Sequence, residues 1–188
     1  MSSPTADEIL RSAGYQSIVM FVFVIQLAIM IAAIVLMNGS DGIKDSKTKT
    51  DVNGMLIFCI IWTFLFTSFL ITGFVRGGTA YYSITPACYM NQSNSLSSVA
   101  TPQSTTKQAI ILLAFVVSTV CLIVVAAMGI PDIKDDKTKT DVTGLLSFSI
   151  TWNFLFTAMM GWSFYNESVI FKYFNPYCKT LLPLLTVQ

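Results

Sequence analysis

The chain has 188 residues, which is the length of one domain, but only 11% of them are charged and 54% are hydrophobic. Soluble proteins carry about 25% charged residues, so the composition excludes a water-soluble globular fold. The formal net charge is +1, and we expect no nucleic-acid partner.

Four long uncharged segments separate the clusters of charge along the chain. They contain 29, 24, 24 and 25 residues, and each holds an apolar run near the ~20 residues that cross a bilayer as a helix. Each run is apolar on all sides, whereas a helix of a soluble bundle needs a polar stripe. The sequence therefore predicts an all-α membrane protein with four transmembrane helices, at about residues 18–37, 54–75, 108–130 and 144–165.

The first apolar run is distinguished from a secretory signal peptide by its flanks and its length. Asp7 and Glu8 precede it, and it ends in Leu36-Met37-Asn38 without a cleavage site of small residues. We interpret it as a retained transmembrane helix.

The chain resembles itself at an offset of 90 residues. Residues 43–54 recur as residues 133–144 with two differences, and 22 of 50 positions are identical between residues 39–88 and 129–178. This similarity predicts two tandem copies of one helical hairpin. The predicted parts are a first repeat (1–90), a polar linker (91–107) and a second repeat (108–188) that ends in a tail at the membrane interface.

Each predicted repeat holds two helices, so both repeats must cross the membrane in the same direction. The connectors of the two hairpins then lie on one side, and both termini lie on the other. The terminal side carries five cations and the connector side six, so the positive-inside rule does not decide the orientation. Because the N-terminal tail is short and lacks a signal peptide, we expect both termini in the cytosol of a membrane that the sequence does not identify.

The connectors share the segment Lys-Thr-Lys-Thr, which is the most distinctive feature of the sequence. Alternating lysine and threonine predicts an extended strand, and two such strands would form a small cap that binds a partner, a lipid headgroup or an identical subunit. The alternative is a solvated connector in which Asp51 and Asp141 cap the helices that follow. The candidate interaction residues are Lys44, Lys47, Lys49, Asp51, Lys134, Lys137, Lys139 and Asp141.

Two aromatic pairs occupy equivalent places in the predicted repeats. Phe58 and Trp62 recur as Phe148 and Trp152, with a spacing of four residues that places each pair on one helical face. We expect these residues to pack between helices, with ligand binding as the alternative.

The cysteines and the missing motifs define what chemistry the sequence supports. Cys88 and Cys178 follow the second and fourth helices; they would form a disulfide outside the cytosol, or stay reduced or acylated within it. The chain has no histidine and no C-x-x-C pair, so no metal site is predicted. No catalytic or cofactor-binding motif is present, and we expect a protein that is not an enzyme.

The predicted helices contain no Asp, Glu, Lys or Arg, which are the usual marks of ion pathways and proton relays. Gln26 and Asn153 are their strongest polar groups, and a hydrogen bond between helices accounts for them. Such residues also suggest an alternative, a small oligomeric channel whose pore between subunits is lined by hydroxyl groups and by Gln26 or Asn153.

A family resemblance lies in the length of the chain, its four spans, its retained first helix and the segments Phe64-Leu65-Phe66 and Phe154-Leu155-Phe156. In these features the chain resembles the MARVEL-type four-span families, which include synaptophysin-like proteins. This resemblance implies a fold of four transmembrane helices in a vesicle or junction membrane, and it carries no site residues. The leading hypothesis is a scaffold that organises a vesicle, junction or organelle membrane, with the lipid bilayer and identical or other membrane proteins as partners. An accessory subunit of a larger membrane complex is a further alternative.

Overall fold

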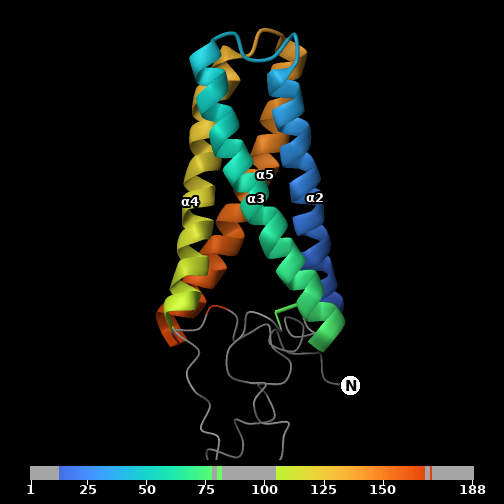
Figure 1. Ribbon diagram of the computed structural model, residues 1–188, viewed down its shortest axis with the longest axis vertical. Helices are drawn as coiled ribbons and strands as arrows, with labels where there is room; N and C mark the ends of the chain where they lie inside the picture. Colours follow the sequence, from blue (N-terminus) through green and yellow to red (C-terminus); the bar gives the residue numbers. More distant parts are fainter. Residues whose placement is uncertain (1–12, 78–79, 82–104, 168–169, 171–188) are drawn as a thin grey trace, which may run out of the picture. The chain divides into compact units, whose positions relative to one another are not determined.

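A computed structural model shows four long helices and one short 3-10 helix, and it describes residues 13–77, 80–81, 105–167 and 170 (Figure 1). The linker residues 91–104, Cys88, Cys178 and the C-terminal tail lie outside the described residues. The elements in chain order are α2 (Ala13–Asn38), α3 (Ser46–Gly77), α4 (Thr105–Gly129), η1 (Ile130–Asp132) and α5 (Asp136–Glu167).

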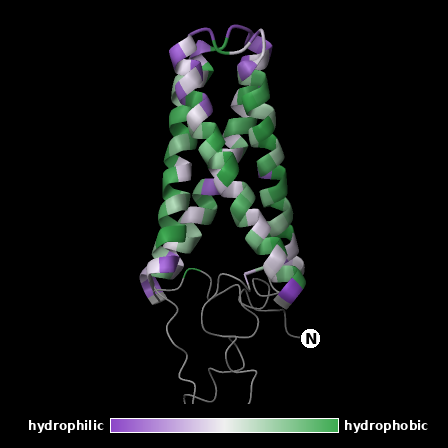
Figure 2. Cartoon of the chain, viewed as in Figure 1, coloured by the Kyte–Doolittle hydropathy of each residue, from purple (hydrophilic) through white to green (hydrophobic). Residues whose placement is uncertain are grey.

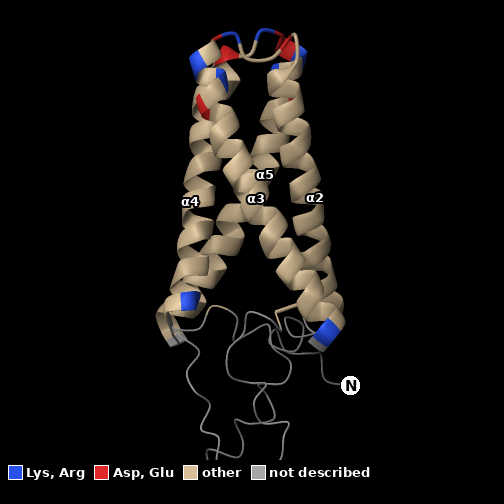
Figure 3. Cartoon of the chain, viewed as in Figure 1, with Lys and Arg blue, Asp and Glu red and all other residues tan. Residues whose placement is uncertain are grey.

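All four α-helices are long and apolar enough to cross a membrane. The spans that meet these criteria are Ala13–Asn38, Ser46–Arg76, Thr106–Asp132 and Asp136–Asn166. Apolar residues cover most of each helix, and charged residues gather at the helix ends (Figures 2 and 3). The protein is therefore an integral, multi-pass membrane protein, and the predicted all-α class with four transmembrane helices is confirmed.

The helices α3 and α5 begin earlier than the sequence predicted, at Ser46 and Asp136 instead of about 54 and 144. The Lys-Thr-Lys-Thr segments form the first turns of these helices, so the predicted extended strands are wrong. The reason is a capping residue before each segment, because a cap that binds the free N–H groups of the first turn lets the following lysines and threonines continue as helix.

The chain packs as two compact units, which we describe separately. The terminal unit comprises Met1–Phe21, Thr67–Ile111 and Met160–Gln188. In it, the side-chain Oε1 atoms of Gln16 and Gln108 accept hydrogen bonds from the backbone N–H groups of Ala80 and Ile170, at 2.7 and 3.3 Å. Both glutamines are buried, and each satisfies a backbone group that follows α3 or α5.

The connector unit comprises Val22–Phe66 and Leu112–Met159. Each of its four helical segments buries residues at alternating spacings of three and four. This heptad spacing keeps one stripe of each helix facing inward in a left-handed bundle. The buried stripes are Phe23, Gln26, Met30, Ala33 and Met37 in α2; Val52, Leu56, Cys59, Thr63 and Phe66 in α3; Phe115, Ser118, Leu122, Val125 and Gly129 in α4; and Val142, Leu146, Ser149, Asn153 and Phe156 in α5.

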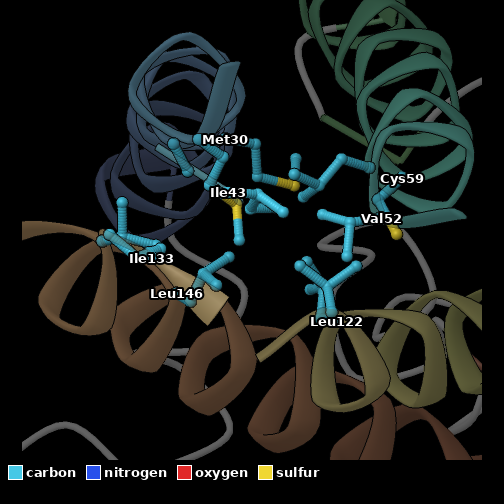
Figure 4. Packing of buried hydrophobic residues seen from close by; sticks show 12 residues of the cluster. Met30, Ile43, Val52, Cys59, Leu122, Ile133 and Leu146 are labelled. Carbon is cyan, nitrogen blue, oxygen red and sulfur yellow. The ribbon is translucent and has the colours of Figure 1, made fainter. Parts of the chain in front are cut away.

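The end of the connector unit nearest the connectors is filled by apolar side chains from all four helices and both connectors (Figure 4). Met30, Leu122 and Leu146 belong to this cluster, and so do Ile43 and Ile133 from the connectors. Gly129 leaves room in it for Met37, because a Cβ atom at position 129 would overlap the end of the Met37 side chain and displace it. The cluster closes this end of the bundle with apolar packing.

Candidate functional site

The two connectors pair with each other through their backbones. Ile43 and Ile133 form an isolated antiparallel bridge, flanked by hydrogen bonds from Lys44 N to Asp132 O and from Lys134 N to Gly42 O, both 3.1 Å. The Asp132 carboxylate also accepts the backbone N–H of Asp45, at 2.7 Å. A small pairing between connectors therefore exists, but it lies before the Lys-Thr-Lys-Thr segments instead of within them.

Asp45 and Asp135 cap the helices that follow the connectors. The Asp45 carboxylate accepts the backbone N–H of Thr48 at 2.7 Å, and the Asp135 carboxylate accepts that of Thr138 at 2.8 Å. These hydrogen bonds hold the pKa of both carboxyls below its ordinary value.

The cap positions correct the prediction for Asp51 and Asp141. Both residues lie inside α3 and α5 and not before them, so neither is the capping residue. Both side chains are exposed on the outer surface of their helices.

The predicted lysines do not act as one group. Lys44, Lys47, Lys134 and Lys137 are exposed, whereas Lys49 and Lys139 are half-buried. The Nζ atoms of Lys49 and Lys134 donate to the carbonyl oxygens of Asn38 and Ser40, both at 3.1 Å. These two lysines thus bind the ends of the connectors, and among the described residues no group of three His, Cys, Asp or Glu could hold a metal ion.

Deeper in the connector unit, one phenylalanine from each helix meets the other three. Phe23, Phe66, Phe115 and Phe156 form an aromatic tetrad in which the ring centroids of all six pairs lie 4.7–6.1 Å apart. Most pairs meet edge to face, which is the favoured geometry of aromatic rings. All four rings are at most 2% exposed, so the tetrad fills the centre of the bundle at this level.

Trp62 and Trp152 extend the tetrad toward the connectors. Trp62 stacks on Phe66 at 6.4 Å and meets Phe115 at 5.5 Å; Trp152 stacks on Phe156 at 6.1 Å and meets Phe23 at 5.7 Å. Their predicted role in helix packing is therefore seen in the structure.

The same prediction is wrong for Phe58 and Phe148, which are each 41% exposed. A spacing of four residues puts two side chains on neighbouring parts of a face, but the tryptophans lie at the edge of the buried stripe. Their phenylalanine neighbours therefore point outward.

Polar side chains lie between the tetrad and the apolar cluster. Gln26, Ser149 and Asn153 are fully buried, and the Gln26 Nε2 atom lies 3.5 Å from the Ser149 carbonyl oxygen, a long hydrogen bond. Ser149, Trp152 and Asn153 occupy positions i, i+3 and i+4 of α5, so their side chains lie on one face. We call Gln26, Ser149, Trp152 and Asn153 the polar side.

The polar side has a counterpart on α3 and α4. Buried positions correspond at an offset of 90 residues between α3 and α5, and of 92 residues between α2 and α4, as for Phe23 and Phe115. These offsets match the four residues of the polar side with a second set, which we call the counterpart side: Ser118, Cys59, Trp62 and Thr63.

Buried polar atoms without a hydrogen-bond partner concentrate on the polar side. Among the described residues, its unpaired atoms are Gln26 Oε1, Ser149 Oγ, Trp152 Nε1 and Asn153 Oδ1. The unpaired atoms of the counterpart side are Ser118 Oγ and Trp62 Nε1. The two sides therefore pack the same rings but offer different hydrogen-bonding groups.

A short hydrogen-bond chain joins the polar side to α4. Asn153 Nδ2 donates to Thr119 Oγ1 at 3.0 Å, and Thr119 Oγ1 lies 3.3 Å from Thr157 Oγ1. Thr157 in turn donates to the Asn153 carbonyl oxygen at 2.6 Å. The hydrogen bond between helices that the sequence suggested for Asn153 is therefore present.

The sequence alone did not identify the tetrad or the polar side as a site. Phe23, Phe66, Phe115 and Phe156 lie in helices that are apolar on every face, so hydropathy does not mark the inward face. The tetrad could have been found from the positions of its residues. Phenylalanine occupies matched places in all four helices, three residues from a buried polar residue in each.

No family model matches the chain, and no curated protein or solved structure shows significant similarity to it.

Proposed function

We propose that the protein is a non-enzymatic structural protein that organises its membrane by assembling laterally with identical copies. The MARVEL-like resemblance, the internal duplication of a hairpin and the cytosolic placement of both termini belong to the same proposal. The interior supports it, because packed rings and apolar side chains fill most of the connector unit, and its segments 22–37, 52–66, 112–131 and 142–159 contain no Asp, Glu, Lys or Arg.

The observation that carries lateral assembly is an outward stripe repeated on α3 and α5. Positions 47, 51, 54, 58, 62 and 65 recur on one face of a helix, since their spacings are three or four residues. All six residues are identical at positions 137, 141, 144, 148, 152 and 155. We call these sets the α3 stripe and the α5 stripe; apart from the half-buried tryptophans, their residues are exposed.

Lipid alone does not require such identity. On the adjoining outward face, residues 53, 57 and 61 all differ from residues 143, 147 and 151, although Phe64 and Phe154 are the same. A face in contact only with acyl chains does not select particular side-chain shapes, whereas contact with a protein does. The stripes therefore support two equivalent contact surfaces on each molecule.

Two stripes on one molecule fit assembly into rows or rings of identical copies. Each stripe carries one cation and one anion a helical turn apart, Lys47 with Asp51 and Lys137 with Asp141. A stripe therefore offers complementary charges to a second stripe at the polar end of the helix, while Phe58, Leu65 and their equivalents supply the apolar contact.

The test is the size of the assembly in bilayers, counted by single-molecule photobleaching of the labelled full chain. We expect wild-type protein to form dimers or larger assemblies, and Phe58→Ala/Phe148→Ala to shift the distribution to monomers. The matched control is Ile57→Ala/Ile61→Ala, which removes apolar area from the adjoining face and should leave the assembly unchanged. A monomeric wild-type protein, or an unchanged Phe58→Ala/Phe148→Ala variant, overturns the proposal.

The channel alternative receives less support from the positions of its polar residues. Gln26 and Asn153 are fully buried inside the connector unit, so they do not line a surface between subunits. The tetrad fills the centre of the same unit. A channel between subunits would therefore need other lining residues, and ion flux through proteoliposomes that hold the assembled protein tests for one.

A further inference from the structure

The polar side holds four buried polar atoms without a protein partner inside a transmembrane bundle. Gln26, Ser149 and Asn153 are fully buried, and Gln26 Oε1, Ser149 Oγ, Asn153 Oδ1 and Trp152 Nε1 are unpaired among the described residues. Hydrocarbon offers no hydrogen bonds, so an unpaired polar atom is costlier in a membrane interior than near water. A partner is therefore expected there.

The four atoms define the chemistry of that partner. The indole Nε1–H of Trp152 is a donor only, the amide oxygens of Gln26 and Asn153 are acceptors, and the Ser149 hydroxyl does both. A bound cation would be repelled by the indole N–H, and a bound anion by the two amide oxygens. Small neutral molecules that both donate and accept hydrogen bonds suit all four atoms.

The surroundings restrict the size of the partner. The tetrad lies on one side of these atoms and the apolar cluster on the other, both within the connector unit. Water is the smallest neutral donor and acceptor, and buried water in proteins typically makes about three hydrogen bonds to otherwise unpaired groups. We propose that ordered water occupies the polar side, held between α2 and α5 by Gln26, Ser149, Trp152 and Asn153.

The counterpart side serves as an internal control for this proposal. Its matched residues are Ser118, Cys59, Trp62 and Thr63, and only Ser118 Oγ and Trp62 Nε1 are unpaired there. The thiol of Cys59 contacts the Ser118 carbonyl oxygen at 3.6 Å, where the polar side has a serine. The polar side therefore offers four unpaired atoms to water and the counterpart side two, although the rings on the two sides are arranged alike.

Nuclear magnetic resonance of the isotope-labelled full chain in lipid nanodiscs tests the proposal. The chain has three tryptophans, so three indole N–H signals report separately on contact with water; Trp→Phe variants assign them. Trp162, which is 68% exposed near the end of α5, is the reference at the membrane surface. We expect a cross peak between long-lived water and the Trp152 indole proton that is several-fold stronger than that of Trp62.

The decisive variant copies the counterpart side onto the polar side: Gln26→Ser/Ser149→Cys/Asn153→Thr. We expect the Trp152 cross peak to fall to the level of Trp62. The control variant Cys59→Ser adds a hydroxyl on the counterpart side and should leave the Trp152 signal unchanged.

The single variant Ser149→Cys, which hardly changes side-chain volume, keeps the test valid if the triple variant does not fold; it should weaken the Trp152 cross peak. A Trp152 indole proton without a water contact in the wild-type protein, or one that is unaffected by both variants, overturns the proposal.

Discussion

The polar side and the counterpart side of the connector unit share one arrangement of rings but differ in their buried polar groups. Trp152 meets Phe23 and stacks on Phe156, just as Trp62 meets Phe115 and stacks on Phe66, with centroid distances that agree within 0.3 Å between matched pairs. Next to these rings, the polar side has glutamine, serine and asparagine. The counterpart side has serine, cysteine and threonine at the matched positions. The aromatic packing thus determines how the helices of the connector unit are arranged, and the residues at the polar positions can differ without changing that arrangement.

The largest loss of stability should come from substitutions in the tetrad, and this loss should be the same on the polar side and the counterpart side. Phe23→Ala and Phe115→Ala each remove one ring from contact with the other three, and each should lower the free energy of unfolding by about 3 kcal/mol. Unfolding in mixed detergent micelles measures it. Phe21→Ala, at a 64% exposed position of α2, is the control and should change little. If Phe23→Ala and Phe115→Ala lower the free energy of unfolding by different amounts, the tetrad does not contribute equally to the two sides.

A smaller effect is expected at Gly129, where the two halves do differ. The matched residue in α2 is Met37, whose side chain occupies the space that a side chain at position 129 would need. Gly129→Leu should therefore destabilise the protein by about 2 kcal/mol through overpacking. Adding Met37→Ala should recover most of the loss, and a double variant no more stable than Gly129→Leu would show that the two residues do not share this space.

The hydrogen bond between Asn153 and Thr119 should contribute less again. A double-mutant cycle of Asn153→Ala and Thr119→Ala should give a coupling of about 0.6 kcal/mol, as is usual for hydrogen bonds between transmembrane helices. The control cycle pairs Ser149→Ala with Thr119→Ala and should give a coupling near zero, because the Ser149 hydroxyl has no partner among the described residues. Equal coupling energies in the two cycles would show that Asn153 does not interact with Thr119 more strongly than Ser149 does.

The smallest effect should come from pH, and it should be the same in both connectors. The pKa of Asp45 and of Asp135 is lowered in the folded protein by the hydrogen bond from Thr48 or Thr138. Each cap is therefore fully effective above the ordinary carboxyl pKa of about 4 and is lost as the pH falls through the lower folded value. Amide protection factors, which correct for the intrinsic exchange rate at each pH, should fall in the first turns of α3 and α5 below about pH 4, and Asp45→Asn should remove this pH dependence in α3 alone.

The number and length of the helices followed from composition, because ~20 uncharged apolar residues have few structures other than a span. The helix starts did not, since the alternation in Lys47-Thr48-Lys49-Thr50 suits a strand as well as an outward helical turn. Only the Asp45 cap, bound to Thr48, decides between them.

The inward faces were also hidden from the sequence. Phe58 and Phe66 are equally apolar, yet one is 41% exposed and the other 1%. Hydropathy separates inside from outside only where the outside is water, so in lipid the choice depends on packing partners from other helices. Gln26 and Asn153 were recognised as polar exceptions, but their neighbours Ser149 and Trp152 became a group only in three dimensions.

The pairing of the connectors has a consequence for the order of events during synthesis. Lys44 N–H and Gly42 C=O find their partners in residues 132 and 134, which the ribosome makes about 90 residues later. Until then, these backbone groups of the first connector have no partner within their own chain. They can pair instead with the second connector of a neighbouring chain. At high expression the exchange of whole hairpins between molecules would compete with closure within one chain.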